Sequence, residues 1–238
     1  MKNYSNPEGR DMNRLPLRTG GLCIATGAVA MMFAAACSSG GLSPRVPIEN
    51  YPLHPGTRAT IFWVGEAATA DNAQIPNNAS AWDENWQRSY GGVDSPARRC
   101  GYWACGFRPK ENPFYFALPC NDLDDEGQPL QKVVELVQWE KTSNDTASVL
   151  KNKWIKVSNP ENGKTVYAQW EDVGPMSEDD CGYVFGDGKQ TPKYNAGLDL
   201  SPATAGYIGD TGETKVTWKF VSEGMVESGP WKEIITRS

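Results

Sequence analysis

The chain has 238 residues, of which 39% are hydrophobic and 22% are charged, and this is the composition of ordinary globular proteins. Its formal net charge is −6 at pH 7, and basic residues form no cluster along the sequence, so nucleic acid is excluded as an expected partner. The length alone permits one or two domains.

The N-terminal segment has the pattern of a signal peptide. Residues 22–36 form an uncharged apolar run that follows several basic residues, and this run is short for a membrane-spanning helix. It ends on three alanines directly before Cys37, which resembles the lipid-attachment motif of bacterial lipoproteins. We therefore predict a signal peptide over residues 1–36 and lipid chains on Cys37 that hold the protein at a membrane surface. Secretion without a lipid is the alternative.

The segment after Cys37 predicts a spacer followed by one domain. Residues 37–56 contain four prolines together with several glycines and serines, a composition typical of flexible linkers. We expect the folded domain to occupy residues 57–238.

The cysteines predict two disulfides. Four cysteines remain once Cys23 leaves with the signal peptide and Cys37 carries lipid: Cys100, Cys105, Cys120 and Cys181. An even number in an exported protein indicates disulfides, and three pairings are open. We favour Cys100 with Cys105, which closes a tight turn, and Cys120 with Cys181, which joins distant segments.

Alternating apolar and polar residues predict short strands rather than long helices. The clearest unit is a hairpin over residues 153–172, in which two alternating runs flank the turn sequence NPENGK. Its second run places Asp172 on the same face as Trp170. Further strands are expected over residues 60–66, 114–119 and 215–221, and short helices over residues 80–90 and 201–209.

This succession of strands, with little helix and many turn residues, predicts a mainly β protein built as a small barrel. The sequences NPENGKT, WEDVGP and LDLSPA follow one another within residues 159–203. In this order they resemble the double-psi β-barrel superfamily, which includes rare lipoprotein A, the expansins and the family 45 endoglucanases. The resemblance implies a six-stranded double-psi barrel with short helices and long loop insertions.

The resemblance also implies three candidate catalytic carboxylates. Asp172 stands where rare lipoprotein A-like transglycosylases keep a catalytic aspartate, and Asp199 stands where expansins and family 45 enzymes place an aspartate at their groove. Glu66 matches the acidic residue at the end of the first strand. The transglycosylases also use a histidine in the segment that matches residues 116–122. This chain has only one histidine, His54, which lies outside that segment. Within the segment, Asp122 is the candidate for a polar residue in place of the histidine.

Nine tryptophans are present, and those on strands are expected in the core. The aromatic residues in the helix and loop segments are candidates for stacking on sugars: Trp82, Trp86, Tyr102 and Trp103. With Asp122 they form the predicted substrate-binding set.

Metal and cofactor sites are not predicted. Residues 122–127 begin like a calcium loop, but Val133 stands where a bidentate glutamate is needed. The spacing of the four cysteines, with a single histidine, fits zinc poorly.

The sequence therefore predicts a monomeric lipoprotein of the cell envelope, anchored outside the cytoplasm. We expect it to bind a β-linked polysaccharide, either peptidoglycan or a cellulose-like glycan. Whether it also cleaves the glycan, as a glycoside hydrolase or lytic transglycosylase, stays open from sequence alone. The alternative is a structural lipoprotein that uses its barrel to hold a protein partner. A glycan site requires carboxylates and rings to lie together, whereas a scaffold leaves them buried or scattered.

Overall fold

The predicted hairpin forms as two antiparallel strands. Strand β5 (Trp154–Ser158) pairs with β6 (Thr165–Val173), and the register sets Ser158 opposite Thr165. Within the turn, the amide of Gly163 donates to the Asn159 carbonyl at 2.9 Å, and the Asn159 side chain donates to the Ile208 carbonyl at 3.0 Å. The turn is therefore tied to a distant segment as well as to itself.

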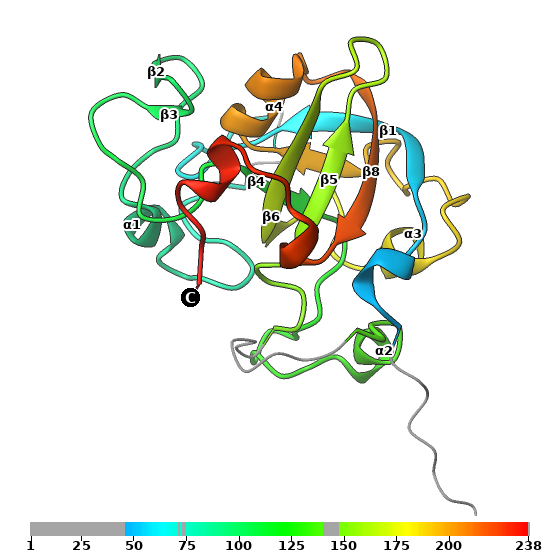
Figure 1. The fold of residues 1–238 in the computed structure, drawn as a ribbon. Coiled ribbons are helices and arrows are strands. Elements are labelled where there is room, and N and C mark those ends of the chain that lie inside the picture. Colours follow the sequence, from blue (N-terminus) through cyan, green and yellow to red (C-terminus); the bar gives the residue numbers. More distant parts are fainter. Residues whose placement is uncertain (1–45, 71, 73–74, 140–147, 238) are drawn as a thin grey trace, which may run out of the picture. The chain divides into compact units, whose positions relative to one another are not determined.

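Six strands close into one barrel. The computed structural model describes residues 46–70, 72, 75–139 and 148–237, and its strands follow the order β1, β7, β4, β6, β5, β8 around the barrel (Figure 1). The β1–β7 and β4–β6 pairs are parallel, and the other pairs are antiparallel. The remaining barrel strands are β1 (His54–Ile61), β4 (Tyr115–Leu118), β7 (Leu198–Leu200) and β8 (Lys215–Val221). The predicted mainly β, six-stranded barrel with short helices is confirmed.

Short elements fill the connections between the barrel strands. A small hairpin joins β2 (Arg99–Cys100) to β3 (Trp103–Ala104). The α-helices are α1 (Trp86–Tyr90), α2 (Gln131–Val134), α3 (Cys181–Phe185) and α4 (Pro202–Ile208). The 3-10 helices are η1 (Ile48–Asn50), η2 (Glu223–Met225) and η3 (Pro230–Lys232).

Helix α4 begins where its sequence predicts. The Ser201 hydroxyl accepts a hydrogen bond from the Thr204 amide at 3.1 Å, and Pro202 occupies the first helical position. Helix α1 is shorter than the predicted helix over residues 80–90. The Ser80 hydroxyl accepts from the amides of Trp82 and Asp83 and so forms a turn instead of a helix cap.

The main hydrophobic core takes residues from all six barrel strands. Its largest fully buried members include Trp170 on β6 and Trp218 on β8, whose rings pack on the neighbouring Phe220. Aromatic side chains bury large apolar areas, and this core therefore supplies most of the hydrophobic stabilisation.

A second core lies between β4 and the long connection after β1. It contains Phe62, Val64, Trp86, Tyr90, Tyr115 and Ala117. The predicted strand over residues 60–66 differs from the structure, because β1 ends at Ile61 and the chain then leaves the barrel to build this second core.

A buried ion pair ties this connection together. The Asp94 side chain is fully buried, and Arg99 Nη1 lies 2.5 Å from its Oδ1. The Tyr115 hydroxyl donates to the other carboxylate oxygen at 3.0 Å and accepts from the Val64 amide at 3.0 Å. Arg99 also donates to the Tyr102 carbonyl. One buried carboxylate thus links the second core to the β2–β3 hairpin.

Both favoured disulfide pairings are confirmed. Cys100 is bonded to Cys105 and Cys120 to Cys181. The first closes the β2–β3 hairpin, and the second joins the end of the β4 segment to α3.

The folded part begins earlier than the predicted boundary at residue 57. Tyr51 packs in the main core, and β1 already starts at His54, which is 2% exposed. The expected linker over residues 37–56 therefore contributes its final residues to the barrel. The predicted signal peptide and Cys37 lie outside the described residues. No helix within the described ranges is long and apolar enough to cross a membrane.

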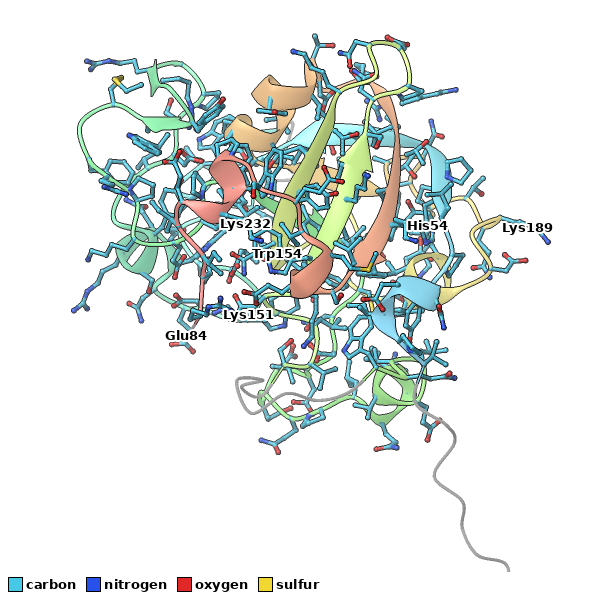
Figure 2. All side chains as sticks on the ribbon, viewed as in Figure 1. His54, Glu84, Lys151, Trp154, Lys189 and Lys232 are labelled. Atoms are coloured by element: carbon cyan, nitrogen blue, oxygen red, sulfur yellow. A yellow bond between two sulfur atoms is a disulfide. The ribbon has the colours of Figure 1, made fainter. Side chains whose placement is uncertain are left out.

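His54 is expected to make stability depend on pH. His54 is labelled in Figure 2. Its ring stacks on Trp218 at a centroid distance of 3.9 Å, and burial lowers its pKa from 6.5 to about 4. Between these values the unfolded chain binds a proton that the native state does not, so stability falls as the pH is lowered from about 6.5 to 4, by about 3 kcal/mol in total.

The matched variant for this effect is His54→Phe, which keeps a flat ring on Trp218 but cannot be protonated. Urea unfolding at pH 7.5 and at pH 4.5 should show a smaller loss for the variant than for the parent chain. Buried carboxyls with raised pKa values act in the opposite direction and are common to both proteins, so the difference isolates His54. Equal losses in the two proteins would contradict the prediction.

Candidate functional site

The strand register brings two of the predicted catalytic aspartates into one row. Asp199 on β7 pairs with Thr60 on β1 and with Ala117 on β4, and Ala117 pairs with Asp172 on β6. Neighbouring strands are about 4.8 Å apart, so the backbones of the two aspartates are separated by roughly 10 Å.

A β-bulge places Asp172 in this row. Phe116 pairs with Trp170, whereas the next residue, Ala117, pairs with Asp172, so Glu171 is an extra residue on β6. The predicted alternation, with Asp172 on the face of Trp170, is therefore interrupted. Bulges of this kind re-aim side chains and are frequent beside functional sites.

The Asp172 carboxylate is buried and receives two backbone hydrogen bonds. Its Oδ1 accepts from the amides of Ala81 at 2.9 Å and Val173 at 2.8 Å. Burial, with a smaller contribution from the charge of Asp199, outweighs the lowering effect of the two amides and raises the pKa of Asp172 to about 7. The Asp172 carboxyl therefore gains or loses its proton near neutral pH.

Asp199 has a different environment, although its pKa is shifted in the same direction. Its carboxylate accepts a hydrogen bond from the Thr60 hydroxyl. Its Oδ2 lies beside Gly174, in ordinary contact distance (3.5 Å) of the position that a Cβ on that residue would take. The residue keeps part of its surface exposed. Burial of its carboxyl, with a smaller contribution from the charge of Glu66, outweighs the hydrogen bond from Thr60 and raises the pKa of Asp199 to about 7.

Glu66 completes a set of three carboxylates. It lies in the loop after β1, where its Oε2 accepts from the Asn77 side chain at 3.0 Å and its backbone amide and carbonyl bond to Trp63 and Asn77. Burial raises its pKa, and its charge acts on Asp199. Of the three residues that the sequence predicts as catalytic, the strand register therefore places Asp172 and Asp199 in one row, and Glu66 is near enough to Asp199 for its charge to raise the pKa of Asp199.

Among the predicted aromatic residues, Trp82 lies beside this carboxylate set. It follows Ala81, whose amide binds Asp172, and its ring meets Trp170 edge-on at 5.8 Å. The Trp82 side chain is half-buried, and the described residues offer its buried indole N–H no hydrogen-bond partner.

The other predicted binding residues lie elsewhere. Trp86 is 2% exposed and belongs to the second core. Tyr102 and Trp103 are on the β2–β3 hairpin, where the ring of Trp103 has the Arg108 guanidinium 5.9 Å above it.

Asp122 holds a loop in place. It is 1% exposed, and its carboxylate accepts from the Ser148 hydroxyl at 2.8 Å and the Val149 amide at 2.6 Å. Because both oxygens are occupied below the surface, it has no free surface for a ligand. The predicted role of Asp122 in substrate binding therefore differs from its place in the structure.

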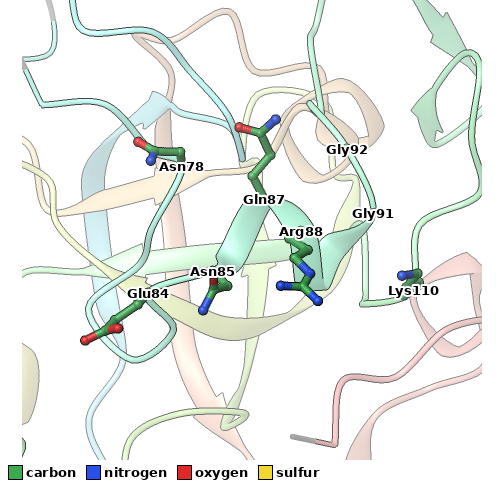
Figure 3. A pocket seen from close by; sticks show the side chains of 8 residues that line it. All are labelled: Asn78, Glu84, Asn85, Gln87, Arg88, Gly91, Gly92 and Lys110. Carbon is green, nitrogen blue, oxygen red and sulfur yellow. The ribbon is translucent and has the colours of Figure 1, made fainter.

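An open polar groove of about 490 Å³ adjoins α1 (Figure 3). It is lined by Asn78, Glu84, Asn85, Gln87, Arg88, Gly91, Gly92 and Lys110. The Gln87 amide donates to the Asn78 carbonyl at 3.1 Å, and Asn78 directly follows the asparagine that binds Glu66. The groove thus begins one residue from the carboxylate set. Sequence reasoning did not identify it, because scattered amides and cations carry no motif.

Within the described ranges, no group of three or more His, Cys, Asp or Glu side chains is arranged to hold a metal ion. The carboxylate set can donate and accept protons with its own side chains. No protein-family model matches the chain, and a comparison with curated proteins finds no match.

Proposed function

We propose that this protein is a lipid-anchored envelope protein with a double-psi type of barrel that binds and cleaves a β-linked polysaccharide. The observation that carries the proposal is the pair Asp172 and Asp199, in one row of the barrel and each with a pKa near 7. The charge of Glu66 also acts on Asp199, and carboxylates close enough to influence one another favour a glycan site over a protein scaffold, for which they can be scattered. The apolar run before Cys37 supports the anchor.

The two aspartates suit different roles in cleavage. Two amide donors favour the ionised form of Asp172, which fits a general base that activates water. Burial and the charge of Glu66 favour the protonated form of Asp199, which fits a general acid. A general acid paired with a base that activates water directly is the arrangement of inverting enzymes, whose carboxyl groups are about 6.5–9.5 Å apart. Strand β4 lies between the two aspartates and separates their backbones by roughly 10 Å, which leaves room for such a water.

Binding is expected to use the surroundings of the carboxylates. The half-buried Trp82 ring can pack on a sugar face, and the amide side chains of the groove beside α1 can bond sugar hydroxyls. Flat rings with a few polar groups are typical of sites for polar ligands with apolar faces.

The test uses the full-length chain in mild detergent, incubated with purified peptidoglycan and, separately, with an insoluble β-1,4-glucan. Protein that sediments with the polymer measures binding, and mass spectrometry of the supernatant measures released sugars. We expect binding and release, with inversion at the anomeric carbon detected by NMR. The Asp172→Asn/Asp199→Asn double variant should bind without release.

The possible outcomes separate the parts of the proposal. Binding without release by the parent chain would reject cleavage and keep the glycan-binding role. Products with anhydro ends would identify a lytic transglycosylase and reject the hydrolytic roles given above. Neither binding nor release would overturn the proposal in favour of a protein-binding scaffold.

A further inference from the structure

A second pocket lies away from the carboxylates. This distal pocket, of about 440 Å³, is lined by Tyr102, Lys164, Thr165, Gly206 and Tyr207. These residues come from the β2–β3 hairpin, the β5–β6 turn and α4, and in Figure 1 α4 is drawn between the hairpin and the turn. Thr165 begins β6 and Asp172 lies near its end, so about 23 Å of strand separates the two sites at about 3.3 Å per residue.

Two tyrosine rings form the apolar part of the distal pocket. The rings of Tyr102 and Tyr207 are 6.0 Å apart at an angle of 46°. Phe114 lies against both, at 5.2 and 6.2 Å, and Trp231 lies 5.3 Å from Tyr207. Tyr102 is 37% exposed. The two rings therefore rest on the core while a face stays available to a ligand.

The pocket is held in shape before any ligand binds. The Cys100–Cys105 disulfide closes the hairpin that carries Tyr102, and Arg99 donates to the Tyr102 carbonyl. On the other side, the Asn162 side chain donates to the Ile208 carbonyl at 2.9 Å and so joins the β5–β6 turn to α4. A site that is already ordered loses less conformational entropy on binding.

The charge of the distal pocket selects the kind of ligand. Lys164 is the one charged residue among those that line it, and it is exposed without an ion-pair partner in the described part of the chain. Lys164 therefore places a positive charge beside the two rings, in a protein whose net charge is −6. A Cβ added to Gly206 would have no other atom within 4 Å, so the space at this residue is open to a ligand.

We propose that the distal pocket is a second glycan-binding site and that it takes an acidic sugar residue. The tyrosine rings pack on the apolar face of the sugar, and the Lys164 ammonium group pairs with its carboxylate. No carboxyl side chain lines the pocket, so it holds the polymer without cutting it. The proposal does not depend on cleavage at Asp172 and Asp199.

The test compares two β-1,4-linked hexasaccharides, an oligomannuronate that carries a carboxylate on every sugar and the neutral cellohexaose. Calorimetric titration uses the full-length chain in detergent with Asp172→Asn and Asp199→Asn, so that neither ligand is cut. We expect tighter binding of the oligomannuronate. Tyr102→Ala and Tyr207→Ala should each weaken it about tenfold, as is typical for a ring at the centre of a binding site, and Lys164→Gln about threefold.

Two further variants guard against misleading results. Gly206→Leu fills the open space of the pocket without removing a ring, and it should abolish binding of the oligomannuronate. Tyr194→Ala removes a tyrosine that is 61% exposed and lies outside the pocket, and it should bind like the parent.

Unchanged affinity in Tyr102→Ala, Tyr207→Ala and Gly206→Leu would overturn the second site, as would equal affinity for the two hexasaccharides. Absence of sugar release from polymers, by contrast, would count only against cleavage at the carboxylate set.

Discussion

Replacing Asp199 with asparagine is expected to lower the rate of sugar release by about 10²–10⁴-fold, the usual contribution of a positioned general acid. The amide keeps the size of the side chain, and its oxygen can still accept from Thr60, so the barrel should fold normally. Asp172→Asn should cause a loss of similar size, because its oxygen can still accept from the Ala81 and Val173 amides but no longer activates water.

The pH dependence of the rate separates the two roles. A general acid must keep its proton, so activity falls as the pH rises through its pKa, and a general base must lose its proton, so activity falls as the pH is lowered through its pKa. Both pKa values lie at about 7, which predicts a narrow bell-shaped profile whose apparent pKa values belong to the pair. The residual activity of Asp199→Asn should lose the alkaline side of this profile.

The matched control is Asp187→Asn, which removes a carboxylate with a largely exposed side chain (61%) and should leave rate and profile unchanged. If Asp199→Asn releases sugars at the parental rate, Asp199 is not the acid. A residual profile that loses its acidic side instead would exchange the roles of the two aspartates.

The second large effect is expected for Asp94→Ala, which should destabilise the fold by about 3–5 kcal/mol, the usual cost of removing one partner of a buried ion pair. Asp94 is fully buried. Without its carboxylate, the Arg99 guanidinium loses its ion-pair partner and the Tyr115 hydroxyl loses its hydrogen-bond acceptor. Urea unfolding of the two proteins measures the difference.

An exposed pair on the same protein provides the comparison. Arg58 and Glu213 form two hydrogen bonds, but the Glu213 side chain is 73% exposed, so solvent screens the pair and Glu213→Gln should cost far less stability than Asp94→Ala. Similar losses for Asp94→Ala and Glu213→Gln would show that burial of the Asp94 pair contributes nothing. Because Arg99 also bonds the Tyr102 carbonyl, Asp94→Ala should in addition weaken binding at the distal pocket.

Local patterns were sufficient where the structure is local. The hairpin of β5 and β6 follows from alternation and a turn sequence, and α4 follows from Ser201 and Pro202. Both disulfide pairings and the mainly β barrel were also predicted. The hairpin and α4 depend on residues that are neighbours in sequence. The disulfides could be predicted because four cysteines allow only three pairings.

The start of β1 was missed because Pro55 and Gly56 are typical of a spacer, yet pairing with β8 and burial of His54 make this segment a strand. Tertiary contacts here outweigh composition. The bulge at Glu171 was also missed, because an extra residue appears only when the partner strand is known.

The candidate site residues do not all lie in one place. Asp172 and Asp199 share one row of the barrel and the charge of Glu66 acts on Asp199, whereas Trp86 and Asp122 are buried and Tyr102 lines a different pocket. Loop residues were judged by polarity and aromatic character alone, and these do not reveal which loop docks on which part of the barrel.

The parallel pairing of β1 with β7 bears on how the protein is made. Thr60 and Asp199 are bonded across 139 positions of the chain, and β1 has its other neighbour in β8, nearer still to the C-terminus. Contacts of such long range slow folding. In the exported chain that we propose, β1 crosses the membrane before the other barrel strands, and it stays unpaired until β7 and β8 have crossed as well. The barrel then closes only after nearly the whole chain has been translocated, and the β5–β6 hairpin is the unit best placed to form earlier.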